Sequence, residues 1–252
     1  MEDLTELLDK WPYDEGSNVR IVVASDGRSV LQVRLPLGVE QYEMEGRPDR
    51  QRPRDFDTVL EYMQDRLKHH IVEHGTDIGF EISEDDASEL QAEGILFYYR
   101  YLLLYQVQYY DMVIRDTEHN INLCDMLERY CRNEEARNAV LQFRPYILRM
   151  NAASRAMAVG QGTLTGDRRR ILSDAIERIE GLEEIDSPAF QFERVRSINY
   201  LRSVMRSLGG EGGRSLEDEL HEAIEAEEYE RAARIRDRMR DRDGIDHVDK
   251  ER

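Results

Sequence analysis

Cysteine, proline and tryptophan are scarce in this sequence, and the scarcity of cysteine already limits the class of protein. The 252 residues include two cysteines, six prolines and one tryptophan. Cys124 and Cys131 are seven positions apart, so on one helix their backbones are separated by roughly 10 Å. That distance is too long for a disulfide, which argues against a disulfide-stapled secreted domain and favours a reducing, cytoplasmic compartment.

Long apolar runs are absent, and so is a recognisable leader. The most apolar run, residues 95–105, is interrupted by Arg100 and is shorter than the roughly 20 residues that a membrane-spanning helix needs. The first fifteen residues are rich in acids and contain a Trp-Pro pair, unlike the basic and apolar regions of a signal peptide. We therefore expect neither a membrane segment nor a signal peptide.

Positive charge is in deficit. The chain has 35 Lys and Arg residues against 53 Asp and Glu residues, which gives a net charge of −18. Such an acidic protein repels the phosphate backbone, so we expect no direct binding of nucleic acid. The glycine-rich run 160–166 lacks the Gly-Lys-Ser/Thr of a phosphate-binding loop, and we expect no cofactor.

What is present predicts a mainly α protein with a small β region (α+β). Residues 1–55 predict an N-terminal antiparallel β meander, because the β-rich stretches 19–24 and 29–35 flank an Asp-Gly turn and residues 37–44 can add a third strand. Residues 56–208 follow the 3.6-residue period of amphipathic helices. They predict a multi-helix domain, either a bundle or a TPR-like array, although no repeat of the TPR length is visible.

Breaks between these helices are marked by glycine and serine. Gly75 can end a first helix that begins near Phe56, and Ser83 can cap the next helix. The apolar period then runs from residue 96 to residue 131, which as one helix would exceed roughly 50 Å, so we expect a bend or two consecutive helices. Further helices are expected at residues 133–143, 146–159, 168–182 and 190–208.

Tyrosines crowd the start of that long apolar period. Residues 95–110 are apolar nearly all round the helix, which is typical of a central, buried helix. We expect the tyrosines to pack in the core, with hydroxyl groups that reach Asp111, Arg115 or Asp116. The alternative is a stacking platform for bases, which suits a chain of this negative charge poorly.

A glycine-rich linker separates the helical domain from the C-terminal segment. Four glycines occur in residues 209–213, so residues 209–214 predict a flexible tether with a mean reach of about 12 Å. Residues 215–242 predict a helical hairpin, and residues 243–252 a polar tail. The tether favours a hairpin that searches for a partner independently of the helical domain.

The predicted hairpin carries an apolar stripe along each arm. Leu216, Leu220 and Ile224 recur at helical spacing in the first arm, and the second arm repeats the pattern from Tyr229 to Met239. Two helices this short bury too little apolar surface to be stable alone, so the stripe needs a partner surface.

Charge is segregated between the two arms. Residues 215–230 contain eight acids and no Lys or Arg, whereas residues 231–242 contain six arginines and two acids. The arms can attract each other within one hairpin, or pair acidic arm to basic arm between two hairpins. Exposed ion pairs contribute roughly 0.2–1 kcal/mol each, so they set orientation more than affinity. The simpler alternative is a solvated helix pair at the end of the domain.

The spacing of these residues resembles that of a known family. Leu216, Leu220, Ala223 and Ile224, followed by Tyr229-Glu230, Ala232-Ala233 and Ile235-Arg236-Asp237, are similar to the UVR motif. That motif occurs in the excision-repair helicase subunit UvrB, the nuclease subunit UvrC, some Clp ATPases and the activator of a bacterial protein-arginine kinase. The resemblance covers residues 215–242 only, and the rest of the chain is unrecognised.

The resemblance implies a non-catalytic module in a bacterial setting. Members of the family bind another protein, often a second UVR hairpin, so the expected partner is a protein with such a hairpin or a second copy of this chain. The side chains implied to form the interface are Leu216, Leu220, Ile224, Tyr229, Glu230, Ala233, Ile235, Arg236, Asp237 and Met239.

A cluster of arginines lies before the first predicted helix. Arg47, Arg50, Arg52 and Arg54 stand in a loop rich in Gly and Pro, outside the basic tail. The cluster predicts either a site for an anion or acidic partner, or a surface loop whose arginines pair with neighbouring acids. The second interpretation is favoured, because acids are abundant around it.

One stretch formally resembles a zinc-peptidase signature. His70, Glu73 and His74 give the H-x-x-E-H pattern of the inverted zinc peptidases. A third acidic ligand cannot be placed, and three histidines in the last turn of a helix also suit the helix dipole without a metal. We therefore expect no metal site and no enzyme activity.

Three hypotheses for the function remain. The first is an interaction or adaptor protein whose hairpin recruits a partner or makes a homodimer; a role in stress-response proteolysis belongs here, although the kinase activator's cysteine-rich zinc motifs are missing. The second is an accessory factor of bacterial nucleotide excision repair that contacts UvrB or UvrC. The third is a metal-dependent hydrolase at the histidine pair.

Overall fold

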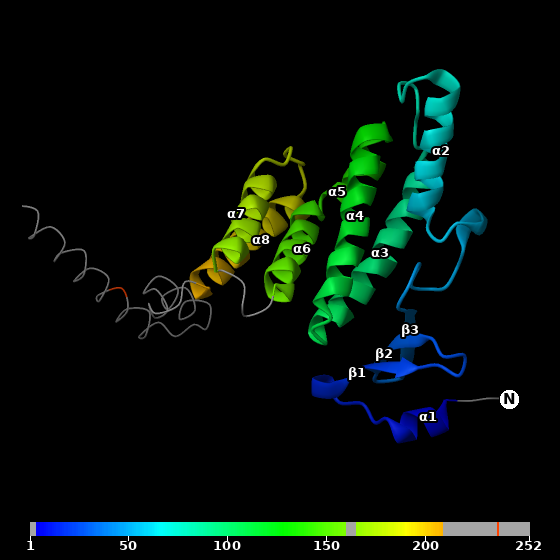
Figure 1. The fold of residues 1–252 in the computed structure, drawn as a ribbon, viewed down its shortest axis with the longest axis vertical. Helices are drawn as coiled ribbons and strands as arrows, with labels where there is room; N and C mark the ends of the chain where they lie inside the picture. The colour runs from blue at the N-terminus through cyan, green and yellow to red at the C-terminus, as the bar shows by residue number, and fades with distance from the viewer. Residues whose placement is uncertain (1–3, 160–164, 209–235, 237–252) are drawn as a thin grey trace, which may run out of the picture.

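The computed structural model describes residues 4–159, 165–208 and Arg236 (Figure 1). The fold is mainly α with one small antiparallel sheet, as predicted. The predicted turn at residues 160–162, the linker 209–214 and the tail 243–252 lie outside the described residues. None of the described helices is long and apolar enough to cross a membrane.

The N-terminal region is a three-stranded meander preceded by a short helix. The strands β1 (Val19–Val23), β2 (Ser29–Leu35) and β3 (Gly38–Glu43) pair antiparallel in the order β1-β2-β3. Gly27 has a left-handed backbone, with φ of 86°, at the predicted Asp-Gly turn between β1 and β2. The preceding segments are α1 (Thr5–Lys10) and the 3-10 turn η1 (Glu15–Ser17).

Helix α2 ends at the predicted glycine and begins with a threonine cap. It follows the 3-10 turn η2 (Pro53–Asp55) and spans Val59–His74. The Thr58 hydroxyl accepts the Glu61 N–H at 3.0 Å as the N-cap. Gly75 ends the helix in the left-handed conformation, with φ of 74°, which a residue with a β-carbon adopts only under strain.

The long apolar period forms two helices, α3 (Glu84–Gln106) and α4 (Tyr110–Tyr130), which pack side by side. Ser83 caps α3, because its hydroxyl accepts the Asp86 N–H at 3.1 Å. The reversal falls at residues 107–109, where Gln108 has φ of 63°. The predicted break is therefore confirmed.

The remaining helices are α5 (Glu134–Leu141), α6 (Arg144–Ala158), α7 (Thr165–Glu180) and α8 (Pro188–Ser207). In Figure 1 the helices stand side by side in a row, with α2 at one end and α7 and α8 at the other. Neighbouring helices in that row differ widely in length, from 23 residues in α3 to 8 in α5. This row is therefore a multi-helix assembly without the equal helix pairs of a TPR array.

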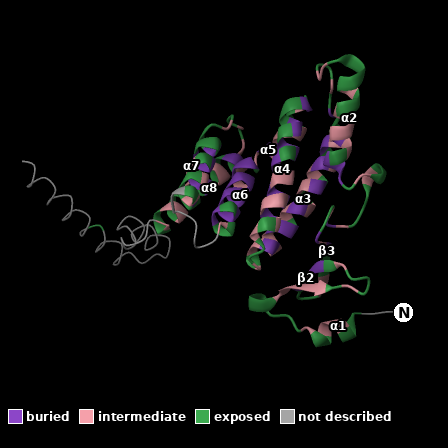
Figure 2. Cartoon of the chain, viewed as in Figure 1, coloured by how far each residue is buried: buried purple, intermediate pink, exposed green. Residues whose placement is uncertain are grey.

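Three apolar clusters fill the spaces between these elements. One joins Leu31 and Tyr42 of the sheet to Tyr101 and Leu104 of α3. A second lies between α2, α3 and α4, and a third between α4, α6, α7 and α8. Tyr146 borders the first and the third, so apolar packing connects the sheet to the last helices. Figure 2 shows buried residues along the helices of the row.

The tyrosine-rich helix is only partly as predicted. Tyr101 is fully buried, but Tyr99 is half exposed. The predicted hydroxyl partners are wrong: the Tyr105 hydroxyl lies 3.2 Å from that of Tyr200, and Asp116 accepts hydrogen bonds from Arg100 instead. The guanidinium of Arg100, which lies in the same apolar run, thus binds the Asp116 carboxylate that the tyrosine hydroxyls were expected to reach.

Candidate functional site

In the sequence, the glycine-rich linker separates the predicted protein interface from the last helix of the row. Helix α8 lies at the end of the row opposite α2, and Leu208 is its C-terminal cap (Figure 1). Of the ten predicted interface residues, the structure describes Arg236, which is helical and exposed. The other nine, Leu216, Leu220, Ile224, Tyr229, Glu230, Ala233, Ile235, Asp237 and Met239, lie outside the described residues.

The arginine loop pairs with acids of its own chain. Arg47 donates to Asp49 at 2.9 Å, and Arg52 lies 3.1 Å from an oxygen of Asp57. Arg54 grips Glu89 through two nitrogens, at 2.6 and 2.9 Å. Each pairing reduces the charge that an external anion would meet.

The fourth arginine, Arg50, faces an acid at longer range. The pKa of the Asp26 carboxyl is lowered, mainly by its hydrogen bonds with Arg28 and in smaller part by the charge of Arg50. All four arginines therefore have carboxylate neighbours, and an incoming anion would have to compete with them. This arrangement supports the interpretation of a paired surface loop.

Glu93 is a buried acid that the sequence did not single out. Its carboxylate is fully buried in α3 and accepts the N–H groups of Val59 at 2.7 Å and Leu60 at 3.0 Å. Arg47 donates to it at 3.3 Å, and the His119 Nε2 atom lies 3.2 Å away. Glu93 therefore completes the N-terminus of α2, where a negative charge is stabilised by free N–H groups.

Arg100 and Asp116 form a second buried group, between α3 and α4. The guanidinium donates to both carboxylate oxygens, at 2.7 and 2.8 Å, and both side chains are almost fully buried. The remaining terminal nitrogen donates to the carbonyl oxygens of Glu43 and Gly46, both at 2.8 Å. This ion pair attaches the chain that follows β3 to the helices. The sequence carried a signal for it, because Arg100 interrupts an apolar run.

The histidine pair is engaged with the backbone. The His70 Nε2 atom donates to the carbonyl oxygen of Ile78 at 3.1 Å, and the His74 Nδ1 atom donates to that of His70 at 3.0 Å. The two rings stack with centroids 4.3 Å apart, which does not point two ring nitrogens at a common ion. In the part of the chain that the structure describes, no three His, Cys, Asp or Glu side chains gather as metal ligands.

Both thiols are buried and free. Burial raises the pKa of the Cys124 thiol to about 12, and burial also raises that of Cys131. A thiol with so high a pKa holds little thiolate at neutral pH and is a poor nucleophile.

Comparison with known families identifies the segment beyond Leu208. The family model described as "UvrB/uvrC motif" matches residues 214–241. These residues are a UVR motif. No curated protein and no solved structure matches the chain. The UVR motif is a protein-interaction module, and the matched residues coincide with those of the predicted hairpin.

Proposed function

We propose that this protein is a non-catalytic adaptor that binds a protein partner, or a second copy of itself, through its UVR motif. The observation that carries the proposal is the family match at residues 214–241. The sheet and the helical row form the folded part of the protein. The glycine-rich linker, with four glycines in residues 209–213, tethers the UVR motif to it.

Charge and apolar patterning support pairing between two hairpins. The first arm has eight acids and the second six arginines, so an antiparallel pair of hairpins places opposite charges together. Tyr229 and Ile224 lie on the apolar stripes, and a buried tyrosine is a common centre of interface affinity.

The first test is the molar mass in solution, measured by light scattering behind a sizing column. We expect the full chain to be a dimer and a variant that ends at Leu208 to be a monomer. If both proteins are monomers, the motif binds a different protein partner. If both are dimers, the result contradicts the assignment, because the helical row would then carry the interface.

The second test changes the stripe itself. Tyr229→Ala should weaken the complex by about 2 kcal/mol or more, and Ile224→Asp should abolish it, because each removes a buried contact. Val72→Asp is the matched control, since Val72 is 86% exposed on α2 and lies outside the motif. Equal loss of binding in Val72→Asp and Ile224→Asp would argue against the motif as the interface.

A second candidate function is an accessory role in bacterial nucleotide excision repair, supported by the UvrB/uvrC description of the matched motif. In that case the chain binds UvrB or UvrC directly. Titration of the purified chain with each subunit, followed by calorimetry, tests it. The absence of binding to both subunits would argue against this role.

A further inference from the structure

Helix α8, at the end of the row, leaves one of its sides open to solvent (Figure 1). Phe192 and Val195 are 63% and 60% exposed, whereas Phe190, Ser197 and Leu201 on the opposite side are buried. Phe192 and Val195 lie three positions apart, so their side chains are neighbours on the helix surface. The exposed side, which we call the outer face of α8, comprises residues 192, 195, 196, 199, 202, 203 and 206.

Arginines continue the outer face towards the C-terminus of α8. Arg196, Arg202 and Arg206 lie on it, and no acid of α8 does. Arg196 lies 3.6 Å from Glu193 and Arg202 lies 2.9 Å from Glu180, but both arginine side chains are more than half exposed. Exposed pairs of this kind are weak, so an incoming carboxylate can join or replace them. The outer face is therefore basic in a chain whose net charge is −18.

The segment that follows α8 carries the complementary chemistry. Leu208 caps α8, and residues 209–214 lead into the predicted first arm of the UVR hairpin. That arm combines the stripe of Leu216, Leu220 and Ile224 with eight acids and no Lys or Arg. Six residues are a usual length for the connection between two neighbouring helices of a bundle. The arm can therefore reach back along α8 and place its stripe on the outer face.

The tether makes even a weak contact effective. A short flexible linker holds two sites at an effective concentration of about 1 mM. A contact with a dissociation constant of about 0.1 mM would then be formed in about nine chains of ten. Two exposed apolar side chains and a few ion pairs are enough for such a contact, although they would not hold two separate proteins together.

Part of α8 also repeats the sequence pattern of the second arm. Residues 192–198, FERVRSI, parallel residues 229–235, YERAARI, with an aromatic residue, Glu, Arg and Ile at corresponding positions. In this alignment Phe192 takes the place of Tyr229, which lies on the apolar stripe of the second arm. The second arm of another hairpin is the surface on which the acidic first arm is expected to pair. Helix α8 offers the first arm similar chemistry within its own chain.

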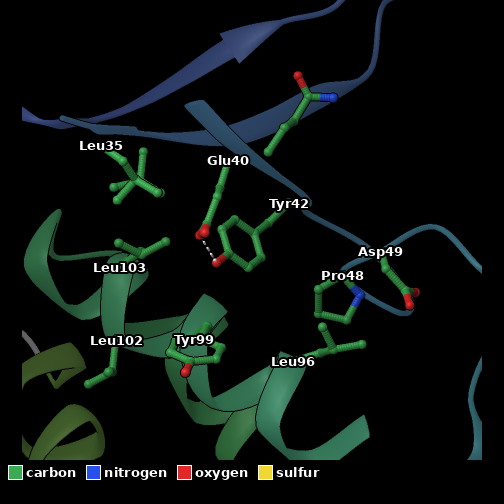
Figure 3. Close-up of a pocket in the computed structure, with 11 residues that line it drawn as sticks. Leu35, Glu40, Tyr42, Pro48, Asp49, Leu96, Tyr99, Leu102 and Leu103 are labelled. Atoms are coloured by element: carbon green, nitrogen blue, oxygen red, sulfur yellow. Dashed lines mark hydrogen bonds between the residues drawn. The ribbon is translucent and has the colours of Figure 1, made fainter. Parts of the chain in front are cut away.

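Another exposed apolar surface, between β3 and α3, has a different character (Figure 3). Tyr99 and Leu103 of α3 line it together with Glu40, whose carboxylate accepts the Tyr42 hydroxyl at 2.7 Å. None of the described residues that line it is Lys or Arg. An arm with eight acids therefore fits this surface less well than the outer face of α8.

We propose that the outer face of α8 is the docking surface for the first arm of the chain's own UVR hairpin. The docked arm covers Leu216, Leu220 and Ile224, which the proposed function assigns to the partner interface. Docking and partner binding then compete for one stripe, and a partner has to displace α8. Docking itself requires only the arm and α8, so this competition is the one part that rests on the proposed function.

The rate at which an introduced thiol is alkylated tests whether the arm covers α8. Asn199 is exposed on the outer face, and both native thiols are buried, so a maleimide reports on the thiol of Asn199→Cys. We define protection as the rate with Leu220→Asp in the arm divided by the rate without it. Protection of Asn199→Cys should be about tenfold, because about one chain in ten is undocked. A value near one would overturn the proposal.

The matched control is a thiol far from the outer face. Val72 is 86% exposed on α2, at the opposite end of the row. Leu220→Asp should leave the alkylation rate of Val72→Cys unchanged. Equal protection of Val72→Cys and Asn199→Cys would overturn the proposal, because the arm would then act on the whole fold and not on α8.

Dilution distinguishes the chain's own arm from that of a second copy. Docking within one chain does not depend on protein concentration, and pairing of two hairpins can only draw the arm away from α8. Protection should therefore stay constant or rise as the protein is diluted. Protection that fades on dilution would overturn the proposal, because a second copy would then cover α8. Molar mass measures pairing and the thiol measures docking, so this proposal and the proposed function can fail separately.

Charge reversal tests the complementarity. Arg196→Glu should lower the protection of Asn199→Cys about threefold, because it turns an attraction for the acidic arm into a repulsion. Arg132→Glu is the matched control, since Arg132 is also exposed and also lies 3.6 Å from one glutamate, but follows α4. It should leave protection within about twofold. Equal loss in the two variants would overturn the proposal.

The same comparison can be made in the arm. At helical spacing Glu219 flanks the stripe of Leu216 and Leu220, whereas Asp218 falls on the other side of the predicted helix. Glu219→Arg should therefore lower protection more than Asp218→Arg, although both change the net charge by the same amount. The reverse order would overturn the proposed orientation of the arm on α8.

Discussion

At the residue scale, the buried Arg100–Asp116 pair ties the two parts of the described fold together. It links α3 to α4 and also holds the carbonyl groups that follow β3. A buried charge whose partner is removed keeps its desolvation cost without the compensating attraction. The cost of breaking this pair should therefore differ sharply from that of an exposed pair.

We expect Arg100→Met to lower the free energy of unfolding by about 3–5 kcal/mol, because Asp116 is left buried and unpaired. Arg54→Met is the matched control, since Arg54 also grips its carboxylate with two nitrogens but both side chains are about two-fifths exposed. That control should lose about 0.2–1 kcal/mol. Urea denaturation measures both, and similar losses would contradict the assigned role of burial.

The Cys124 thiol should make stability depend on alkaline pH. An exposed thiol ionises near its ordinary value of 9.0, whereas the buried Cys124 stays protonated until about 12. The folded state then binds more protons than the unfolded state, so stability falls as pH rises above 9.0. The Cys124→Ala variant has no thiol at this position, so this contribution to the pH dependence of stability is absent from it.

The stability advantage of the unaltered chain over Cys124→Ala should therefore shrink as pH rises from 9.0 towards 12, by at most about 1.4 kcal/mol per pH unit. Urea titrations of the two proteins at a series of alkaline pH values measure it. Tyrosines ionise in both chains, so the difference isolates the thiol. Stability curves that stay parallel through this range would contradict the burial effect.

Single buried residues were predictable only where they broke a pattern. Arg100 stands in an apolar run, and the sequence therefore marks it as unusual. Glu93 stands among other polar residues of a helix, where nothing in the sequence separates it from solvated acids. Its partners, the N–H groups of Val59 and Leu60, lie on another helix more than thirty positions away. Such a contact is set by packing, which local periodicity does not encode.

At the element scale, helix ends were predictable because local chemistry fixes them. Ser83 caps the start of α3 with its hydroxyl, and Gly75 ends α2 in the left-handed conformation. Both effects depend on the residue itself and its neighbours in the sequence. The length of the apolar period predicted a break between α3 and α4, but the sequence did not show where it falls. The reversal contains neither glycine nor proline, and Gln108 adopts a φ of 63° there. The Gln108 N–H donates to the Tyr105 carbonyl oxygen and the Tyr109 N–H to that of Leu104, so local hydrogen bonds at the end of α3 hold a conformation that glycine usually marks in a sequence. The UVR motif could be recognised from side-chain spacing alone.

The N-terminus of α2 should depend on a side chain from α3. Glu93→Ala removes the acceptor of two buried N–H groups and should cost about 3 kcal/mol. Thr58→Ala, which frees only the Glu61 N–H, should cost about 1 kcal/mol. Hydrogen exchange should accelerate at Val59 and Leu60 in the first variant and at Glu61 in the second. Faster exchange at the same amides in both would contradict this division.

At the scale of the whole molecule, the sheet and the helices should unfold together. Trp11 is the one tryptophan of the chain, and it contacts the sheet through Arg20, whose guanidinium lies 3.8 Å from the ring centre. The Arg34 side chain also donates to the Trp11 carbonyl oxygen at 2.8 Å. Tryptophan fluorescence therefore reports the sheet, whereas far-ultraviolet circular dichroism reports the helices.

We expect the two signals to show coincident urea transitions, because Arg100 and the shared apolar clusters join the sheet to the helices. The same coincidence should hold for a variant that ends at Leu208. Fluorescence that changes at a lower urea concentration than the dichroism would mean that residues 1–55 fold as a separate unit.

The row arrangement also bears on the order in which the chain folds. Helices that touch are close along the chain: α3 packs on α4, α4 on α6, and α6 on α7 and α8. Contacts of short sequence separation close small loops, so the row should assemble in roughly microseconds to milliseconds. The bond from Arg100 to the Glu43 carbonyl spans 57 positions and needs the meander in place. We therefore expect the sheet to dock last, with the Tyr101 and Leu104 side chains exposed to solvent until it does.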